Sequence, residues 1–168
     1  MLNFFLGIIF VLAITALIYG YRVCKKYKRK KSIKNSYMIQ NVDTKLIIRP
    51  LNAGIENGVE IIQYRPKNWD CTTWEFIEIE KNKYFLKNLW THKGFEKKDD
   101  GSLIQNELGG KNQHYILEKS ENGVRIKLAG SNLYITASDN KVNSKLVLKK
   151  WRASEKQLWI LVRQNPIV

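Results

Sequence analysis

Few residues in this chain have the type and spacing that catalysis or metal binding requires. The two histidines, His92 and His114, stand far apart, and neither has cysteine or acidic neighbours at the spacing of a zinc site. Asp99 and Asp100 adjoin a glycine, and paired carboxylates in such a charged stretch are typical of a solvated turn. Gly109-Gly110-Lys111 lacks the first glycine and the Ser or Thr of a phosphate-binding loop. We therefore expect no catalytic residue, no metal and no cofactor, and the sequence predicts that the protein is not an enzyme.

A three-residue motif recurs along the chain and indicates its organisation. Gln157-Leu158-Trp159 is the clearest copy, and Gln113-His114-Tyr115 and Thr72-Thr73-Trp74 are weaker ones. The copies are about forty residues apart, which is the spacing of a repeated supersecondary unit. Each copy runs directly into an apolar segment and follows a strand-like segment, so the sequence predicts three similar units.

The segments between these motifs have the pattern of short strands separated by turns. Helical periodicity does not persist after the N-terminal segment, and Asn122-Gly123 is the strongest hairpin signal. The predicted strands are Lys45–Arg49, Val59–Tyr64, Trp74–Glu80, Tyr84–Asn88, Leu103–Asn106, Tyr115–Glu118, Val124–Leu128, Leu133–Ala137, Leu146–Lys150 and Trp159–Val162. We therefore expect an all-β domain over residues 37–168.

The three units resemble the ricin B-type β-trefoil, whose repeats of about forty residues each close with Gln-x-Trp. The resemblance covers roughly residues 38–164; its third copy is exact, the second has Tyr for Trp, and the first keeps only the Trp. It implies a threefold all-β domain, a β-trefoil. The residues expected in its repeat core are Trp74, Tyr115, Gln157 and Trp159.

The same resemblance implies where a sugar would bind. In sugar-binding members, each site combines an Asp after the first strand, an aromatic platform and an Asn before Gln-x-Trp. The sequence alignment places Ile48, Ile62 and Cys71 there in the first repeat, Leu86, Asn106 and Asn112 in the second, and Thr136, Lys149 and Lys156 in the third. No repeat has the Asp together with an aromatic ring, so we expect no classical galactose pocket.

An apolar segment and a basic run precede this domain. Leu2–Tyr21 is almost unbroken in apolar character, and about 20 such residues in a helix span the roughly 30 Å of a bilayer. We expect residues 1–21 to be a transmembrane anchor and residues 22–36 a polybasic tether with no fold of its own. A cleaved signal peptide is the alternative, although the segment has no basic start and no clear cleavage site.

The net charge of +14 is concentrated in the basic run, which contains no acidic residue. Basic residues beside a membrane helix stay on the cytoplasmic side and attract anionic headgroups, so we expect a single-pass membrane protein with its domain on the cytosolic or non-lumenal side. The residues expected at the membrane surface are Arg22, Lys25, Lys26, Lys28, Arg29, Lys30 and Lys31. We favour this role over a nucleic-acid patch. The arrangement also resembles, in a generic way, envelope proteins of large DNA viruses of insects.

A few side chains outside the repeat core are candidates for contact with a partner. They are Trp90, which stands in a polar segment after a predicted strand, and the basic residues Lys149, Lys150 and Arg152. We expect a non-catalytic β-trefoil scaffold that binds a protein partner in a membrane or viral-envelope complex. The alternative is a lectin-like, carbohydrate-binding adhesion factor.

Overall fold

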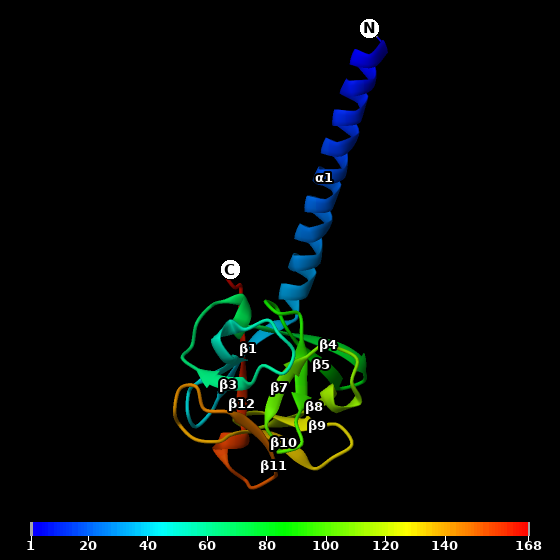
Figure 1. Cartoon of the computed structure of the whole chain (residues 1–168). Coiled ribbons are helices and arrows are strands. Elements are labelled where there is room, and N and C mark those ends of the chain that lie inside the picture. The colour runs from blue at the N-terminus through cyan, green and yellow to red at the C-terminus, as the bar shows by residue number, and fades with distance from the viewer. Residues whose placement is uncertain (1, 168) are drawn as a thin grey trace. The chain divides into compact units, whose positions relative to one another are not determined.

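The computed structural model describes the backbone of residues 2–167, and the side chains in that range except those of residues 2–9 and 111. The chain forms two compact units, Met1–Lys34 and Asn35–Val168. The first unit is a single helix, α1 (Leu2–Lys34), and the strands all belong to the second (Figure 1).

The expectation of a transmembrane anchor over residues 1–21, and with it of a single-pass membrane protein, is wrong. Among the described residues, no helix combines the length and the apolar character that crossing a membrane requires. The basic run continues the same helix as far as Lys34, so it is not the irregular tether that we expected.

Six strands of the second unit close into a barrel, because each pairs with two neighbours and the last returns to the first. In order around the barrel, the pairs are β1 with β4, β4 with β5, β5 with β8, β8 with β9, β9 with β12 and β12 with β1. These strands are β1 (Ser36–Asn41), β4 (Trp74–Glu80), β5 (Lys83–Asn88), β8 (Tyr115–Ser120), β9 (Gly123–Leu128) and β12 (Trp159–Arg163).

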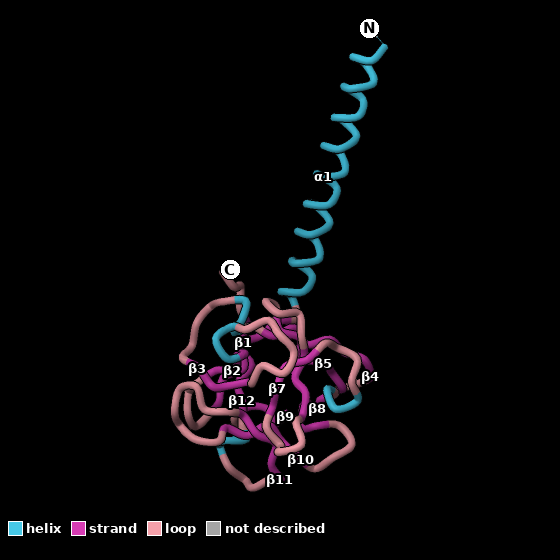
Figure 2. The backbone as a smooth tube through the Cα atoms, viewed as in Figure 1, coloured by secondary structure: helices cyan, strands magenta, loops and turns pink. Residues whose placement is uncertain are grey.

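The other six strands form three hairpins that contact one another in a second layer (Figure 2). The hairpins are β2 (Ile47–Pro50) with β3 (Ile61–Tyr64), β6 (Gly94–Lys97) with β7 (Leu103–Asn106), and β10 (Leu133–Ala137) with β11 (Leu146–Lys150). Single bridges, Glu60 to Ile104, Ile62 to Lys145 and Ser102 to Val147, join each hairpin to the other two. A closed barrel with three such hairpins is a β-trefoil, which confirms the all-β threefold part of the expected fold.

Two strands were missing from the sequence-based prediction, β1 and β6. β6 contains Gly94, Glu96 and Lys97, residue types that are depleted in strands, so neither its composition nor its alternation indicates one. Because β6 was overlooked, β5 was aligned with the hairpin strands β2 and β10, although it is a barrel strand. The true second-repeat counterpart of β2 and β10 is β6.

The centre of the domain is filled by the aromatic residues of the three closing motifs. Trp74, Tyr115 and Trp159 are fully buried, and each opens a barrel strand after a short 3-10 helix: η2 (Asp70–Thr72), η3 (Lys111–Gln113) or η4 (Glu155–Gln157). The indole nitrogens of Trp74 and Trp159 donate to the carbonyls of Ile48 and Ile135, each at 3.0 Å. Each tryptophan therefore joins the barrel to a hairpin of its own repeat.

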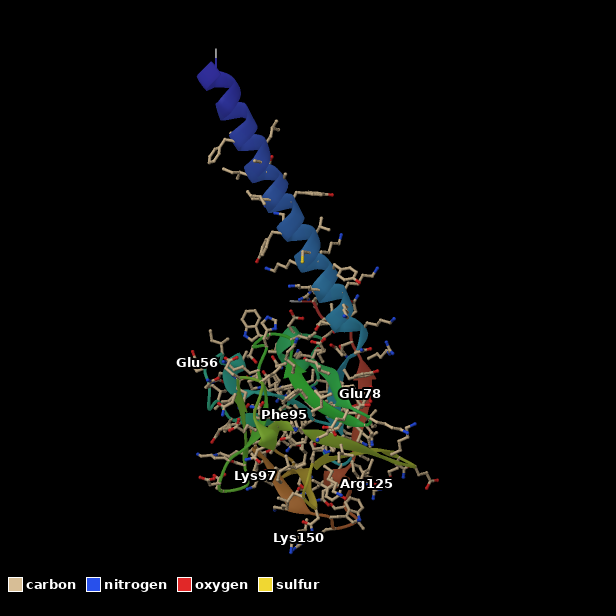
Figure 3. All side chains as sticks on the ribbon, turned by 90° about the vertical axis from the view of Figure 1, so that its right-hand side faces the viewer. Glu56, Glu78, Phe95, Lys97, Arg125 and Lys150 are labelled. Atoms are coloured by element: carbon tan, nitrogen blue, oxygen red, sulfur yellow. The ribbon has the colours of Figure 1, made fainter. Side chains whose placement is uncertain are left out.

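The second repeat fills the centre of the domain differently, because Tyr115 stands where the other two repeats have tryptophan. The ring of Phe95 lies between Trp74 and Tyr115, with centroids 4.2 Å and 5.9 Å away, inside the domain (Figure 3). The hydroxyl of Tyr115 is buried and has no hydrogen-bond partner among the described residues. Burial is the main cause that raises the pKa of Tyr115, so this hydroxyl stays neutral.

Close approach of two strands requires a glycine at the start of β9. Gly123 has φ of +149°, and a Cβ there would lie 2.6 Å from the carbonyl oxygen of Trp159. A side chain at this position would separate β9 from β12, so Gly123 helps to close the barrel.

We expect Trp159→Ala to lower the free energy of unfolding by about 3–5 kcal/mol, because it removes a fully buried ring and leaves a cavity. Urea unfolding of the full chain measures this change. Trp151→Ala is the matched control: that ring is 38% exposed, so the loss should stay near or below about 1 kcal/mol. Equal losses in the two variants would contradict the central position of Trp159.

We expect Tyr115→Phe to raise the free energy of unfolding by about 1 kcal/mol, since burying an unpaired hydroxyl is unfavourable and the ring itself is kept. The same urea titration measures it. A clear loss of stability would mean that the hydroxyl is satisfied in solution.

Candidate functional site

Strand register locates the three positions at which a β-trefoil of the ricin B type would hold a sugar. Ile48, Phe95 and Ile135 pair with Gln63, Gln105 and Leu148 in the three hairpins. The residue after each member of a pair gives the equivalent site positions, which are Arg49 with Tyr64, Glu96 with Asn106, and Thr136 with Lys149. The alignment made from sequence was therefore wrong at three positions. It gave Ile48 in place of Arg49 and Ile62 in place of Tyr64. In the second repeat it gave Leu86, on β5, in place of Glu96, on β6.

The first repeat has an aromatic platform, but an arginine covers it. The guanidinium carbon of Arg49 lies 3.6 Å from the ring centroid of Tyr64, and Arg49 is only 8% exposed. This cation–π contact occupies one face of the ring. The classical position of the first repeat is thus filled by the protein's own side chain.

The second repeat has the carboxylate but not the ring. Gln113, the closing-motif glutamine, donates from Nε2 to Glu96 Oε2 at 2.8 Å and to the carbonyl of Glu107 at 2.7 Å. The platform position holds Asn106, whose side-chain oxygen accepts from the backbone nitrogen of Gly58 at 3.0 Å. Glu96 was missed from sequence because β6 was missed; its place just after Phe95, as Thr136 follows Ile135, is the signal that could have found it.

The third repeat has neither group. Thr136 accepts from Gln157 Nε2 at 2.9 Å, and the platform position is the exposed Lys149. The pattern of these three positions agrees with the expectation that no repeat combines a carboxylate with an available aromatic platform.

A hollow that includes Cys71, one of the positions aligned from sequence in the first repeat, lies between the first and second repeats. It has a volume of about 320 Å³ and is lined by Ala53, Trp69, Asp70, Cys71 and Trp90. Trp90 is 47% exposed, whereas Asp70 and Cys71 are 5% and 8% exposed. We call this hollow the Trp69–Trp90 pocket.

Hydrogen bonds hold the two tryptophans of the pocket in place. The indole nitrogen of Trp90 donates to the carbonyl of Ala53 at 3.0 Å, although the residues are far apart in the chain. The buried Asn88 accepts from the backbone nitrogen of Trp90 at 3.1 Å and donates to the carbonyl of Cys71 at 3.0 Å. The Trp90 turn is therefore tied to the opposite wall of the pocket.

The first closing motif supports the other tryptophan. The hydroxyls of Thr72 and Thr73 donate to the carbonyl of Trp69 at 2.9 Å and 2.8 Å. Thr72 stands in the place of the motif's glutamine, and its single hydroxyl proton is shared between the carbonyl of Trp69 and that of Lys67, 2.6 Å away. The two threonines thus fix the loop in a repeat that lacks the motif's glutamine, and Trp69 in that loop lines the pocket.

The thiol of Cys71 does not supply reactive chemistry to the pocket. Burial is the main cause that raises its pKa, and Arg49 only partly opposes this effect. The thiol stays protonated near neutral pH, and a protonated thiol is a poor nucleophile. What the pocket offers is two aromatic rings and a carboxyl-bearing residue.

The basic residues singled out from sequence are neighbours in the chain of an aromatic residue of the third repeat, Trp151. The guanidinium carbon of Arg125 lies 4.8 Å from the Trp151 ring centroid, and the Tyr134 ring centroid is 5.7 Å away. Exposed basic side chains adjoin it in the chain: Lys149, Lys150 and Arg152. We call this the Trp151 surface, and Figure 3 shows two of its residues, Arg125 and Lys150.

No protein-family model and no curated protein sequence matches the chain. Its fold is similar to that of the designed threefold-symmetric protein ThreeFoil, with 18% identity, a TM-score of 0.72, and coverage of 76% of this chain and 98% of that one. The Macrolepiota procera ricin B-like lectin in complex with lactose has 18% identity and a TM-score of 0.66, over 76% of this chain and 94% of that one. The Rhizoctonia solani agglutinin has 14% identity and a TM-score of 0.69, over 77% and 95%. At these identities the similarity establishes the fold alone, a β-trefoil.

We expect the full chain to show no saturable binding of lactose or galactose through the classical positions. Arg49 covers the ring of Tyr64, and the second and third repeats have no ring at the platform position. Isothermal titration with lactose up to millimolar concentration tests this. Saturable binding that Glu96→Gln or Tyr64→Ala abolishes would contradict it.

Proposed function

We propose that the β-trefoil is a non-catalytic binding module that takes a saccharide at the Trp69–Trp90 pocket. The observation that carries this proposal is the pocket itself, in which two tryptophans from different repeats and the carboxyl-bearing Asp70 line one open hollow. This proposal differs from the protein-binding scaffold expected from sequence. It follows the lectin-like alternative, but with the saccharide bound at the Trp69–Trp90 pocket.

The composition of the pocket suits a sugar ring. A pyranose presents a flat face of C–H groups, which stacks on an aromatic ring, and hydroxyls at its edge, which need hydrogen-bond partners. Trp90 is fixed by its bond to Ala53, so binding orders little further side-chain freedom. In this proposal, the two tryptophan rings contact the apolar face of the sugar.

The fold supports a binding role of this kind. The Macrolepiota procera lectin has the same fold and is seen in complex with lactose. Since fold alone carries no activity, the support for this chain remains the chemistry of its own pocket.

A second candidate is a protein partner with an acidic face, bound at the Trp151 surface. A partly exposed Trp stacked against Arg has the composition of an interface hot spot. Lys149, Lys150 and Arg152 beside it would attract acidic residues of the partner.

One set of variants separates the two candidates. We expect the full chain to bind a defined subset of a glycan array, and Trp90→Ala to reduce that binding at least about tenfold, since a stacked ring contributes on the order of 1–2 kcal/mol. Trp69→Ala should act in the same direction. Trp151→Ala, the matched control, should leave glycan binding unchanged.

Other outcomes assign the function differently. An array without a saturable signal would overturn the saccharide proposal. A glycan signal that Trp151→Ala removes, and Trp90→Ala does not, would place the site on the third repeat.

A further inference from the structure

The open end of the barrel contains a second hollow, on the side of the core rings away from the hairpins. Phe76, Leu117 and Leu161 lie two residues after Trp74, Tyr115 and Trp159, so they are equivalent by the threefold repeat and point the same way as those rings. With Tyr37 and Tyr84 they line a hollow of about 300 Å³, to which Glu78 also contributes. We call it the barrel-mouth hollow.

One side of this hollow departs from the threefold symmetry of the barrel. Register makes Tyr37, Tyr84 and Val124 equivalent, because they pair with Trp74, Tyr115 and Trp159 respectively. Counting along the strands makes Glu78, Lys119 and Arg163 equivalent at the rim. Glu78, the acid among the described lining residues, and the rings of Tyr37, Phe76 and Tyr84 therefore gather around β4, where the other repeats have aliphatic and basic residues.

These side chains are in mutual contact. The rings of Tyr37 and Phe76 meet edge to face with centroids 5.3 Å apart, and those of Phe76 and Tyr84 are 6.1 Å apart. The hydroxyl of Tyr84 lies 3.5 Å from Glu78 Oε1. Burial, and after it the carboxylate of Glu78, raises the pKa of Tyr84, so the phenol stays neutral beside the acid.

Rings and a carboxylate in this arrangement attract a cation. An aromatic face draws an ammonium or guanidinium group, and a nearby carboxylate adds a direct charge interaction. Tyr37 already shows this behaviour, since the guanidinium carbon of Arg163 lies 5.6 Å from its ring centroid. Phe76, Tyr84 and the carboxylate of Glu78 also line the hollow.

We propose that the barrel-mouth hollow binds a small organic cation with an alkylated ammonium group, held between Phe76, Tyr84 and Glu78. This site is separate from the Trp69–Trp90 pocket and does not depend on saccharide binding there. A hollow of about 300 Å³ accommodates such a group together with a short substituent.

The test is a titration of the full chain with tetramethylammonium chloride, followed by amide chemical shifts at constant ionic strength. We expect saturable shifts, and none with tert-butanol, a neutral molecule of similar shape. Glu78→Gln should weaken binding about fivefold, in the range of one charge or cation–π contact. Tyr84→Leu should abolish saturation.

Two control variants keep the result interpretable. Glu80→Gln changes another exposed acid on the same strand, outside the lining, and should leave the affinity unchanged. Trp90→Ala should also leave it unchanged, which separates this site from the proposed saccharide pocket. Absence of saturable shifts, equal binding of tert-butanol, or an equal loss in Glu80→Gln would each overturn the proposal.

Discussion

The packing of three large rings on the axis of the barrel is the constraint on which the rest of the structure depends. Trp74, Tyr115 and Trp159 begin the three barrel strands that follow the closing motifs, and all are fully buried. A barrel of six short strands leaves an interior that side chains must fill, and only large side chains reach across it. Because two of the rings also donate to hairpin carbonyls, the same contacts hold both layers together.

The interior preserves the threefold repeat, whereas the surface has lost it. Inside, the three repeats face the same space, so each needs a side chain of similar size at the same place. At the surface no such requirement holds, and Arg49, Glu96 and Thr136 occupy one position in the three repeats. Both proposed sites accordingly lie where one repeat differs from the other two.

Both proposed sites use residues that the fold brings together from separate repeats. The Trp69–Trp90 pocket exists because the turn after β5 reaches back to the loop of the first repeat, where Trp90 donates to Ala53. The barrel-mouth hollow combines side chains of β1, β4 and β5 with those of β8 and β12. In each case a rigid framework positions side chains whose identity the framework itself does not require.

The sequence by itself determined the repeat, its period and the residues at its centre, because buried positions accept few residue types and each copy of the motif repeats them. Asn122-Gly123 likewise indicated the β8–β9 hairpin, because Asn-Gly is typical of the tight turn between two paired strands. The apolar run at the N-terminus, in contrast, predicted an anchor that the described part of α1 does not support. Only the tertiary structure decided the register that places Arg49 over Tyr64 and the meeting of Trp69 with Trp90. Those contacts depend on strand pairing and on the paths of the loops, which bring distant residues together. Neither the pairing nor the loop paths can be predicted from local residue patterns.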